Sequence, residues 1–176
     1  MAGSKNTAFN ITNTKKEDGP AVYEIAKSSS SLDLNSRYCY LLLCLHFNKF
    51  CLIAKSDEEA VGFVLAYQHP HCADTLFIWQ IAVDPRFQNL GIGTGLLKRL
   101  VLLAAENGLN YIETTITPSN KASYAIFKKI SGEYSADCQE SVYFPRNLFE
   151  GDHEEERLLR IGPIEKPKEG ESNENI

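Results

Sequence analysis

One stretch of this 176-residue chain, from Ile78 to Leu97, limits the possible folds more than any other. It reads as a buried strand, a short loop and a glycine-rich turn that opens a helix. Residues 75–83 are apolar on both alternating faces except at Thr75 and Gln80, which is typical of a central strand covered on both sides. After Gly93, apolar residues recur at helical spacing. Glycines at a helix start let backbone N–H groups approach a ligand, and the helix dipole favours an anion there, so the stretch predicts a phosphate-binding loop.

Two common phosphate-binding patterns fit this loop poorly. A dinucleotide-binding fold requires G-x-G-x-x-G directly after a strand, with an acidic residue about 20 positions later. Gly91, Gly93 and Glu113 imitate that pattern, but Leu96 stands at the third glycine position. About eight residues also separate the strand from the helix, which is too many for the tight turn of that fold. A P-loop would close with Gly-Lys and a hydroxyl residue, which Gly95-Leu96-Leu97 does not supply.

The composition narrows the class of protein and of partner. The length predicts one domain over 15–164, between an N-terminal arm at 1–14 and a charged tail at 165–176 that favours disorder. A net charge of -5 and a pI near 5.4 argue against nucleic-acid binding and suit a small cationic substrate. Residues 1–14 lack the apolar run of a signal peptide or membrane segment. Five cysteines without a C-x-x-C pair indicate free thiols in a reducing, cytoplasmic compartment.

Hydrophobic periodicity outlines the other elements. A helix begins near Gly19-Pro20, and the apolar run at 37–47 fits either a buried helix or a strand, with Asn35 or Ser36 as a cap. The arm, with Phe9 and Ile11 as its sizeable apolar anchors, is a loose segment or an edge strand. The remaining expected elements are a hairpin of strands at 50–55 and 60–67, a strand at 110–117, a helix from Asn120 to Gly132, and last strands at 133–138 and 158–161.

The spacing Gln88-x-x-Gly91-x-Gly93 resembles the pyrophosphate loop of the GCN5-related N-acetyltransferases (GNATs), which hold acetyl-coenzyme A (acetyl-CoA). A glycine turn that merely begins a helix is the alternative for the loop by itself. The order of strand, glycine loop, helix, strand, asparagine-containing helix and strand is also the GNAT order. The resemblance implies an α/β (α+β) fold with a mixed, mostly antiparallel central sheet flanked by helices.

Four segments resemble more narrowly the diaminobutyrate acetyltransferases of ectoine biosynthesis, in the right order from Asp33 to Pro163. They are residues 35–44 (NSRYCYLLLC), 74–80 (DTLFIWQ) and 113–120 (ETTITPSN), and His153-Glu154-x-Glu156 followed by 159–163 (LRIGP). The resemblance implies transfer of an acetyl group from acetyl-CoA to the side-chain (γ) amine of L-2,4-diaminobutyrate, on the route to the osmoprotectant ectoine. The amine must lose a proton, because an ammonium group of this kind is mostly protonated at neutral pH and only the neutral form attacks the thioester.

For the cofactor, the resemblance places the pyrophosphate on the glycine loop and the pantetheine arm along the preceding strand. Asn120 contacts the cofactor arm, caps a helix, or does both. Many GNATs place a tyrosine seven residues after this asparagine as the acid that protonates the leaving thiolate. Phe127 stands there and has no proton to give, so Tyr124, one turn earlier, is the candidate acid unless the thiolate leaves without one. The expected cofactor-binding residues are Ile81, Ala82, Val83, Gln88, Asn89, Leu90, Gly91, Ile92, Gly93, Thr94, Asn120 and Phe127.

For the amino acid, Asp33 and Glu156 are the preferred partners of the ammonium groups, and Arg37 of the substrate carboxylate. If residues 151–161 are extended, Glu154 and Glu156 fall on one face and His153 on the other. Each assignment has a plainer alternative: a solvated charge run at 152–157, a surface arginine and a core tryptophan. The expected substrate-binding residues are Asp33, Arg37, Tyr38, Trp79, Thr115, Glu154 and Glu156.

His153 is interpreted as a proton acceptor or a substrate contact, and together with Glu156 and Tyr124 it makes up the expected catalytic set. Residues 153–157 do not form the H-E-x-x-H pattern, and no second histidine or cysteine stands at ligand spacing, so no metal site is expected. The expected partner is the small amino acid, with no nucleic acid and no membrane, and a homodimer is left open. The alternatives are a same-fold acetyltransferase for another amine and a non-catalytic acyl-CoA-binding module.

Overall fold

The computed structural model describes residues 8–29 and 31–164. The expected tail at 165–176 and residues 1–7 of the expected arm lie outside the described residues. The described chain divides into two compact units. The first unit comprises the described residues up to Leu65 together with Gln80–Arg99, and the second comprises Ala66–Trp79 together with the described residues from Leu100 on.

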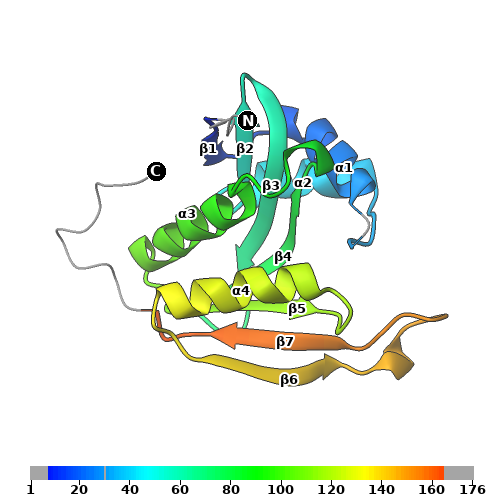
Figure 1. Ribbon diagram of the computed structural model, residues 1–176, viewed down its shortest axis with the longest axis vertical. Helices are drawn as coiled ribbons and strands as arrows, with labels where there is room; N and C mark the ends of the chain where they lie inside the picture. Colours follow the sequence, from blue (N-terminus) through cyan, green and yellow to red (C-terminus); the bar gives the residue numbers. More distant parts are fainter. Residues whose placement is uncertain (1–7, 30, 165–176) are drawn as a thin grey trace, which may run out of the picture. The chain divides into compact units, whose positions relative to one another are not determined.

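The seven strands pair in the order β1-β2-β3-β4-β5-β7-β6 (Figure 1). β4 and β5 are parallel, whereas the pairs β1–β2, β2–β3, β5–β7 and β6–β7 are antiparallel. This mixed, mostly antiparallel sheet confirms the expected fold class. The elements are β1 (Asn10–Asn13), η1 (Lys16–Asp18), α1 (Gly19–Ser28), α2 (Arg37–His46), β2 (Leu52–Ser56), β3 (Glu59–Gln68), β4 (Thr75–Val83), η2 (Pro85–Phe87), α3 (Ile92–Glu106), β5 (Tyr111–Ile116), α4 (Lys121–Glu133), β6 (Cys138–Phe144), η3 (Arg146–Leu148) and β7 (Glu156–Ile161).

In the first unit, two open questions of the sequence are settled. The arm is an edge strand over its described part, because β1 pairs with β2 from Asn10 opposite Lys55 to Asn13 opposite Leu52. The apolar run at 37–47 is the helix α2, and its cap is Ser36, whose hydroxyl accepts a hydrogen bond from the backbone N–H of Cys39 at 3.2 Å.

A glycine in β3 determines how closely the start of α3 approaches the sheet. A Cβ at Gly62 would lie 3.1 Å from the carbonyl oxygen of Ala82 and 3.1 Å from Cγ2 of Ile92, tighter than most real Cβ contacts. Ile92, on the first turn of α3, is buried together with Leu96. The small residue on β3 therefore lets the helix begin directly above the end of β4, which positions the glycine-rich loop.

In the second unit, β5 lies between β4 and β7. Thr75 stands opposite Tyr111 in the parallel pair, and Glu113 stands opposite Arg160 in the antiparallel pair. Glu113 and Arg160 form an ion pair, and the Arg160 guanidinium lies 4.0 Å from the ring centroid of Tyr111. Burial of this pair is offset by mutual charge neutralisation and by the stacked ring.

The prediction of a strand at 133–138 is wrong. Helix α4 continues through Glu133, one residue past Gly132, and Ser135 then adopts a left-handed conformation with φ of 49°. The strand begins only at Cys138 and runs to Phe144, and every residue after Cys138 in it is exposed. Because successive residues of this strand do not alternate between buried and exposed positions, its sequence carries no period-two hydrophobic signal. Within the described residues, none of the helices has the length and apolar character that crossing a membrane requires.

Candidate functional site

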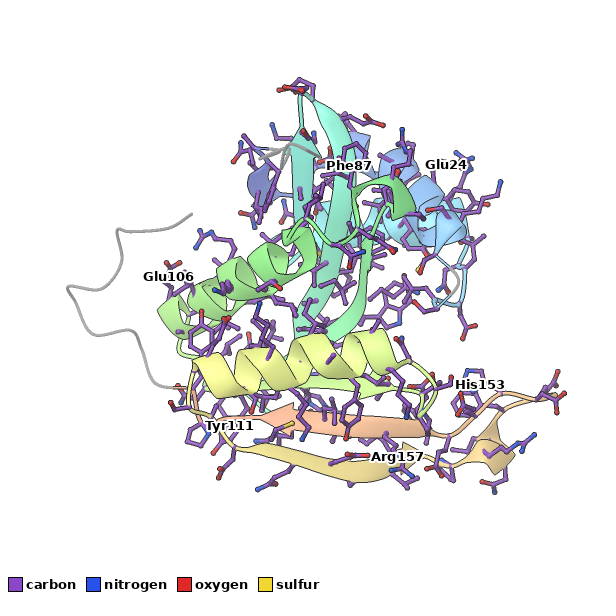
Figure 2. The ribbon with its side chains drawn as sticks, in the orientation of Figure 1. Glu24, Phe87, Glu106, Tyr111, His153 and Arg157 are labelled. Carbon is purple, nitrogen blue, oxygen red and sulfur yellow. The ribbon has the colours of Figure 1, made fainter. Side chains whose placement is uncertain are left out.

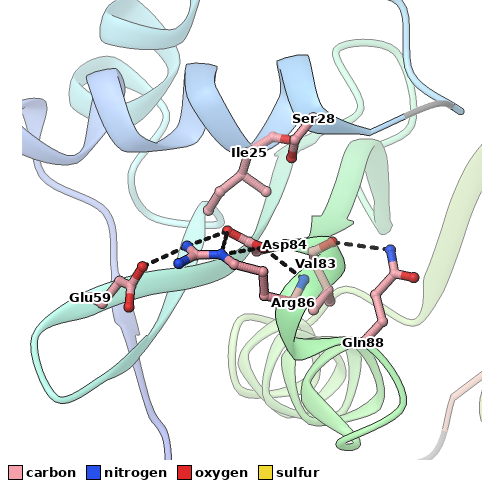
Figure 3. Close-up of polar contacts among 7 residues, drawn as sticks. All are labelled: Ile25, Ser28, Glu59, Val83, Asp84, Arg86 and Gln88. Carbon is pink, nitrogen blue, oxygen red and sulfur yellow. Dashed lines mark hydrogen bonds and ion pairs between the residues drawn. The ribbon is translucent and has the colours of Figure 1, made fainter.

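A cluster of charged groups holds the start of the loop between β4 and α3 (Figure 3). Asp84 Oδ1 accepts a hydrogen bond from the backbone N–H of Arg86 at 2.9 Å, and its Oδ2 lies 2.8 Å from Arg86 Nη2. Arg86 Nη2 also lies 2.6 Å from Glu59 Oε1. The hydrogen bonds from Arg86 hold the pKa of the Asp84 carboxyl below its usual range, and both carboxylates raise the pKa of Arg86. The backbone N–H of Asp84 donates to Val61 at 2.9 Å, which fixes the loop to β3.

Replacement of Asp84 by Asn tests this anchor. Since the folded-state pKa of Asp84 is depressed, its contribution to stability is complete above the ordinary aspartate pKa of about 3.9 and is lost as the pH falls through the lower folded-state value. We expect Asp84→Asn to lower the free energy of unfolding at pH 7 by about 1 kcal/mol and to flatten its fall in acid. Urea unfolding between pH 2 and 7 measures both effects, and Asp57→Asn in the β2–β3 turn is the matched control. An unchanged acid dependence would show that Asp84 does not anchor the loop.

The rest of this loop has the geometry of an anion cradle. Gly91 has φ of 82°, and among the described residues no atom beyond Gly91 and its two chain neighbours lies within 4 Å of a Cβ built on it. Its carbonyl oxygen accepts the bond from the N–H of Gly95 at 2.9 Å. The amides of Ile92, Gly93 and Thr94 therefore belong to the first turn, where N–H groups have no acceptor within the helix. These amides and the positive end of the helix dipole suit a phosphate group.

The other expected cofactor residues of the first unit lie beside this cradle. Gln88, Asn89 and Leu90 are exposed, and Asn89 has φ of 63°. Gln88 Nε2 donates to the carbonyl oxygen of Val83 at 3.4 Å, which links the loop to the end of β4 (Figure 3). On β4, Ala82 is buried, whereas Ile81 and Val83 on the opposite face are partly exposed.

The segment that carries Asp33 is tied to α2 and β4 by a chain of hydrogen bonds. The hydroxyl of Tyr40 donates to Gln80 Oε1 at 3.1 Å, and Gln80 Nε2 donates to the carbonyl oxygen of Asp33 at 2.9 Å. The backbone N–H of Asn35 donates to the same Tyr40 hydroxyl at 3.4 Å. Sequence reasoning gave Tyr40 and Gln80 no role. The available signal was Gln80 itself, a polar residue in the middle of an otherwise apolar strand.

Arg37 and Tyr38 lie on the first turn of α2. Arg37 Nη2 is 2.5 Å from Glu24 Oε1 of α1, and its guanidinium lies 4.3 Å from the ring centroid of Tyr23. Tyr38 is 68% exposed. Arg37 therefore has partners on α1, as expected of a surface helix residue, and its contact with the substrate carboxylate stays a prediction.

In the second unit, His153 lies just before β7 (Figure 2), and Glu156 is the first residue of that strand. His153 Nε2 is 3.9 Å from Glu156 Oε1, and the ring of Phe149 stacks on the imidazole with centroids 4.1 Å apart. His153 Nδ1 lies 2.6 Å from the carbonyl oxygen of Glu154. Because a carbonyl oxygen only accepts, Nδ1 carries the proton of the neutral ring, and Nε2 is the nitrogen that can take up another.

The opposite-face arrangement of His153 and Glu156 was expected only for an extended chain over 151–161, and this condition is not met. Gly151 has φ of 68° in a turn, and β7 begins only at Glu156. The charge run at 152–157 is also not uniformly solvated, since every residue from His153 to Arg157 is partly buried. Within it, Arg157 pairs with Glu155 at 2.8 Å and with Glu140 of β6 at 2.9 Å.

The remaining predicted residues of the second unit lie on three elements. Trp79 on β4 is partly exposed, and Thr115 on β5 stands opposite Leu158 of β7. Asn120 caps α4, since its Oδ1 accepts from the N–H of Ser123 at 3.1 Å. The cap interpretation of Asn120 is thus confirmed, and its contact with the cofactor stays a prediction.

The two aromatic residues of α4 differ in their surroundings. Phe127 is 1% exposed, so this position belongs to the core and offers no acid. Tyr124 is half-buried, with Lys128 Nζ 5.7 Å from its ring centroid, and remains the candidate for that role. Within the described part of the chain, no group of three or more histidine, cysteine, aspartate or glutamate side chains is placed to hold a metal ion.

Comparison with known proteins gives consistent matches. The acetyltransferase (GNAT) family matches residues 19–132. The L-2,4-diaminobutyric acid acetyltransferase of Shouchella clausii is 45% identical over 155 residues, which cover 88% of this chain and 86% of that protein. The enzyme of the same name from Marinococcus halophilus is 40% identical, covering 94% and 98%. Diaminobutyrate acetyltransferase EctA from Paenibacillus lautus, solved with L-2,4-diaminobutyric acid and coenzyme A, is 37% identical with a TM-score of 0.86, covering 92% of this chain and 98% of that one.

Proposed function

We propose that this chain, which belongs to the acetyltransferase (GNAT) family and within it to the L-2,4-diaminobutyric acid acetyltransferases, acetylates the side-chain amine of L-2,4-diaminobutyrate with acetyl-CoA. The observation that carries the proposal is the loop at Gly91, whose positive φ leaves the first-turn amides of α3 open to a pyrophosphate. The choice of acceptor is supported by the Paenibacillus lautus relative, which holds the same amino acid together with coenzyme A. The product, N-γ-acetyl-diaminobutyrate, belongs to ectoine synthesis, and residues 15–164 are proposed to act as one acetyltransferase domain.

In this proposal, the backbone amides of residues 88–94 bind the pyrophosphate of acetyl-CoA. Main-chain groups of Ile81, Ala82 and Val83 align the pantetheine arm, because a strand end offers regularly spaced N–H and C=O groups. The cofactor contact of Asn120 uses its amide group beside the bond that caps α4. Phe127 contributes an apolar wall from the core of α4.

The cationic amino acid is bound in this proposal by carboxylates. Asp33, Glu154 and Glu156 supply negative charge for the two ammonium groups, consistent with an acidic protein of net charge -5. Arg37 is proposed to bind the substrate carboxylate, and Tyr38, Trp79 and Thr115 are further proposed substrate contacts.

The ammonium group has to lose one proton before its nitrogen attacks the thioester carbon. His153 Nε2 accepts this proton, directly or through a water molecule, and the Glu156 carboxylate 3.9 Å away stabilises the imidazolium that results. Stacking on Phe149 and the bond from Nδ1 to Glu154 hold the ring in one orientation. The coenzyme A thiolate then takes a proton from Tyr124 or leaves as the anion.

The test of the reaction is an assay of thiol release from acetyl-CoA with diaminobutyrate, ornithine and lysine as acceptors. We expect the highest kcat/KM with diaminobutyrate and acetylation at the γ nitrogen, established by mass spectrometry or NMR of the product. A preference for one of the longer diamines would favour an acetyltransferase for another amine. Absence of turnover with each acceptor, in a protein that binds acetyl-CoA, would favour a non-catalytic binding module.

Removal of either protein carboxylate proposed to bind the substrate, Asp33 or Glu156, should weaken binding of diaminobutyrate but not of acetyl-CoA. We expect Asp33→Ala and Glu156→Ala each to raise the KM for diaminobutyrate about tenfold to a hundredfold, because a charge-assisted hydrogen bond contributes roughly 1.5–3 kcal/mol. The affinity for acetyl-CoA should stay unchanged in both variants. Asp152→Ala, which removes an exposed carboxylate from the same charge run, is the matched control. Wild-type KM in both substrate variants would place the ammonium-binding carboxylates elsewhere.

We further infer that the protein acts in the cytoplasm. All five cysteines, Cys39, Cys44, Cys51, Cys72 and Cys138, are free thiols, which suits a reducing compartment. Burial raises the pKa of the Cys44 thiol to about 11, so this side chain stays protonated and chemically inert. The assembly is proposed to be either a monomer or a homodimer, which sedimentation would distinguish.

A further inference from the structure

Tyr40 and Gln80 form a buried pair whose hydrogen bonds end on the segment that carries Asp33. Tyr40 is fully buried and Gln80 is 6% exposed. A buried carboxamide requires partners for both its oxygen and its nitrogen, and here each has one: the Tyr40 hydroxyl and the Asp33 carbonyl oxygen. Residues 31–36 belong to no helix or strand, so these side chains supply hydrogen bonds that regular structure would supply elsewhere.

We propose that Tyr40 and Gln80 are positioning residues for the amino-acid substrate, acting through the backbone at Asp33. Their bonds to the Asp33 carbonyl and the Asn35 amide hold both sides of Leu34, and thereby set the direction in which the Asp33 carboxylate leaves the chain. This inference rests on the proposed function, in which Asp33 binds an ammonium group of diaminobutyrate.

Two observations show that the pair itself has little conformational freedom. The Tyr40 ring packs edge-on against Tyr23 with centroids 6.0 Å apart, which fixes its position on α2. Gln80 is fixed by its place in the middle of β4. The hydrogen bonds therefore connect the loop at residues 31–36 to helix α2 and strand β4, through two side chains that are 40 residues apart in sequence.

The mutants that test the pair remove hydrogen bonds while keeping volume. Tyr40→Phe deletes one hydroxyl and keeps the ring. We expect it to raise the KM for diaminobutyrate about threefold to tenfold, the effect of one or two neutral hydrogen bonds, with kcat and the KM for acetyl-CoA unchanged. Gln80→Met removes both carboxamide bonds and should raise the same KM about tenfold to a hundredfold.

The double variant Tyr40→Phe/Gln80→Met distinguishes a connected pair from two separate contributions. If Tyr40 acts mainly through Gln80, the KM of the double variant should lie within about twofold of that of Gln80→Met, instead of the product of the two single effects. The double variant also removes the buried hydroxyl that Gln80→Met deprives of its Gln80 acceptor, so we expect it to be at least as stable as that single variant.

Thr14→Val is the matched control for loss of a buried hydroxyl. Thr14 Oγ1 donates to the carbonyl oxygen of Cys44 at 3.2 Å, on the same helix as Tyr40 but with no bond to the Asp33 segment. This variant should lose a comparable amount of thermal stability while its KM for diaminobutyrate stays at the wild-type value. A wild-type KM for diaminobutyrate in both Tyr40→Phe and Gln80→Met, or an equal rise in KM with Thr14→Val, would overturn the proposal and leave Tyr40 and Gln80 a purely structural role.

Amide hydrogen exchange gives a readout that does not depend on turnover. Exchange at Leu34 and Asn35 should accelerate in Tyr40→Phe and in the double variant, and should stay unchanged in Thr14→Val. If wild-type protein fails to acetylate diaminobutyrate, the proposed function is wrong whatever the exchange shows. If wild-type protein is active but the variants keep the wild-type KM, only the positioning role is wrong.

Discussion

Replacement of Gly91 by Val is expected to lower the affinity for acetyl-CoA more than a hundredfold while the protein stays folded. Gly91 has φ of 82°, a conformation that costs an L-residue about 1–2 kcal/mol. If the loop relaxes to a negative φ, the amides of the cradle turn away from the phosphate. Loss of two charge-assisted hydrogen bonds of roughly 1.5–3 kcal/mol each then accounts for the expected effect, since about 1.4 kcal/mol corresponds to a factor of ten.

The control for this experiment lies at the other end of the same helix. Gly108 has φ of 74°, and among the described residues no atom beyond Gly108 and its two chain neighbours lies within 4 Å of a Cβ built there either. Gly108→Val therefore introduces a similar backbone strain with no proposed ligand nearby. Calorimetry should show wild-type acetyl-CoA affinity for Gly108→Val and none measurable for Gly91→Val. Equal affinities in two folded variants would remove the phosphate cradle from the proposed site.

The second large effect is expected from His153→Ala. General-base catalysis typically contributes a factor of about 10² to 10⁴, so kcat should fall at least about a hundredfold while acetyl-CoA still binds. In wild-type enzyme, kcat/KM should rise with pH and level off, because only the neutral imidazole accepts a proton. In the variant, this rise should be flattened or shifted. His71→Ala, which removes an exposed histidine from the turn between β3 and β4, should leave rate and pH profile unchanged.

The pH profile of the variant distinguishes titration of His153 from titration of the substrate amine as the cause of the rise in kcat/KM with pH. If the pocket merely lowers the pKa of the substrate amine by desolvation, the variant keeps the wild-type profile with a modest loss of rate. Full activity of His153→Ala between about pH 6 and 9, a span that brackets the usual titration of histidine, would end any catalytic role for this residue. Glu156→Gln adds a further test, because loss of the carboxylate 3.9 Å from Nε2 should reduce proton uptake by the ring without removing it.

Features that depend on neighbours in sequence could be predicted from the sequence. The strand at 75–83 has the expected bounds, because its apolar run ends where Pro85 cannot donate to a sheet. The glycine turn opens α3, and Asn120 caps α4 with its own side chain. Each of these depends on periodicity or turn chemistry within a few residues, which a sequence displays directly.

Features that depend on residues distant in sequence could not be predicted from the sequence. The apolar run at 37–47 suits a helix or a strand equally, and only packing within the first unit makes it α2. The last strand before β7 was misplaced because β6, exposed along nearly its whole length, has no hydrophobic period. The closeness of His153 to Glu156 results from a turn at Gly151 and the late start of β7. A chain extended throughout residues 151–161 would place His153 and Glu156 farther apart.

The sequence by itself therefore indicated the family and the fold class, through the resemblance of short segments to those of known acetyltransferases, and it showed the glycine loop and the asparagine cap, which are local patterns. The tertiary structure decided which groups support them. Gln80 Nε2 and the Asp33 carbonyl oxygen are 47 residues apart in sequence and 2.9 Å apart in space, and Tyr40 reaches Gln80 from helix α2. The physical reason is that a buried polar side chain must find a partner wherever the fold brings one, and sequence order does not limit which residue that is.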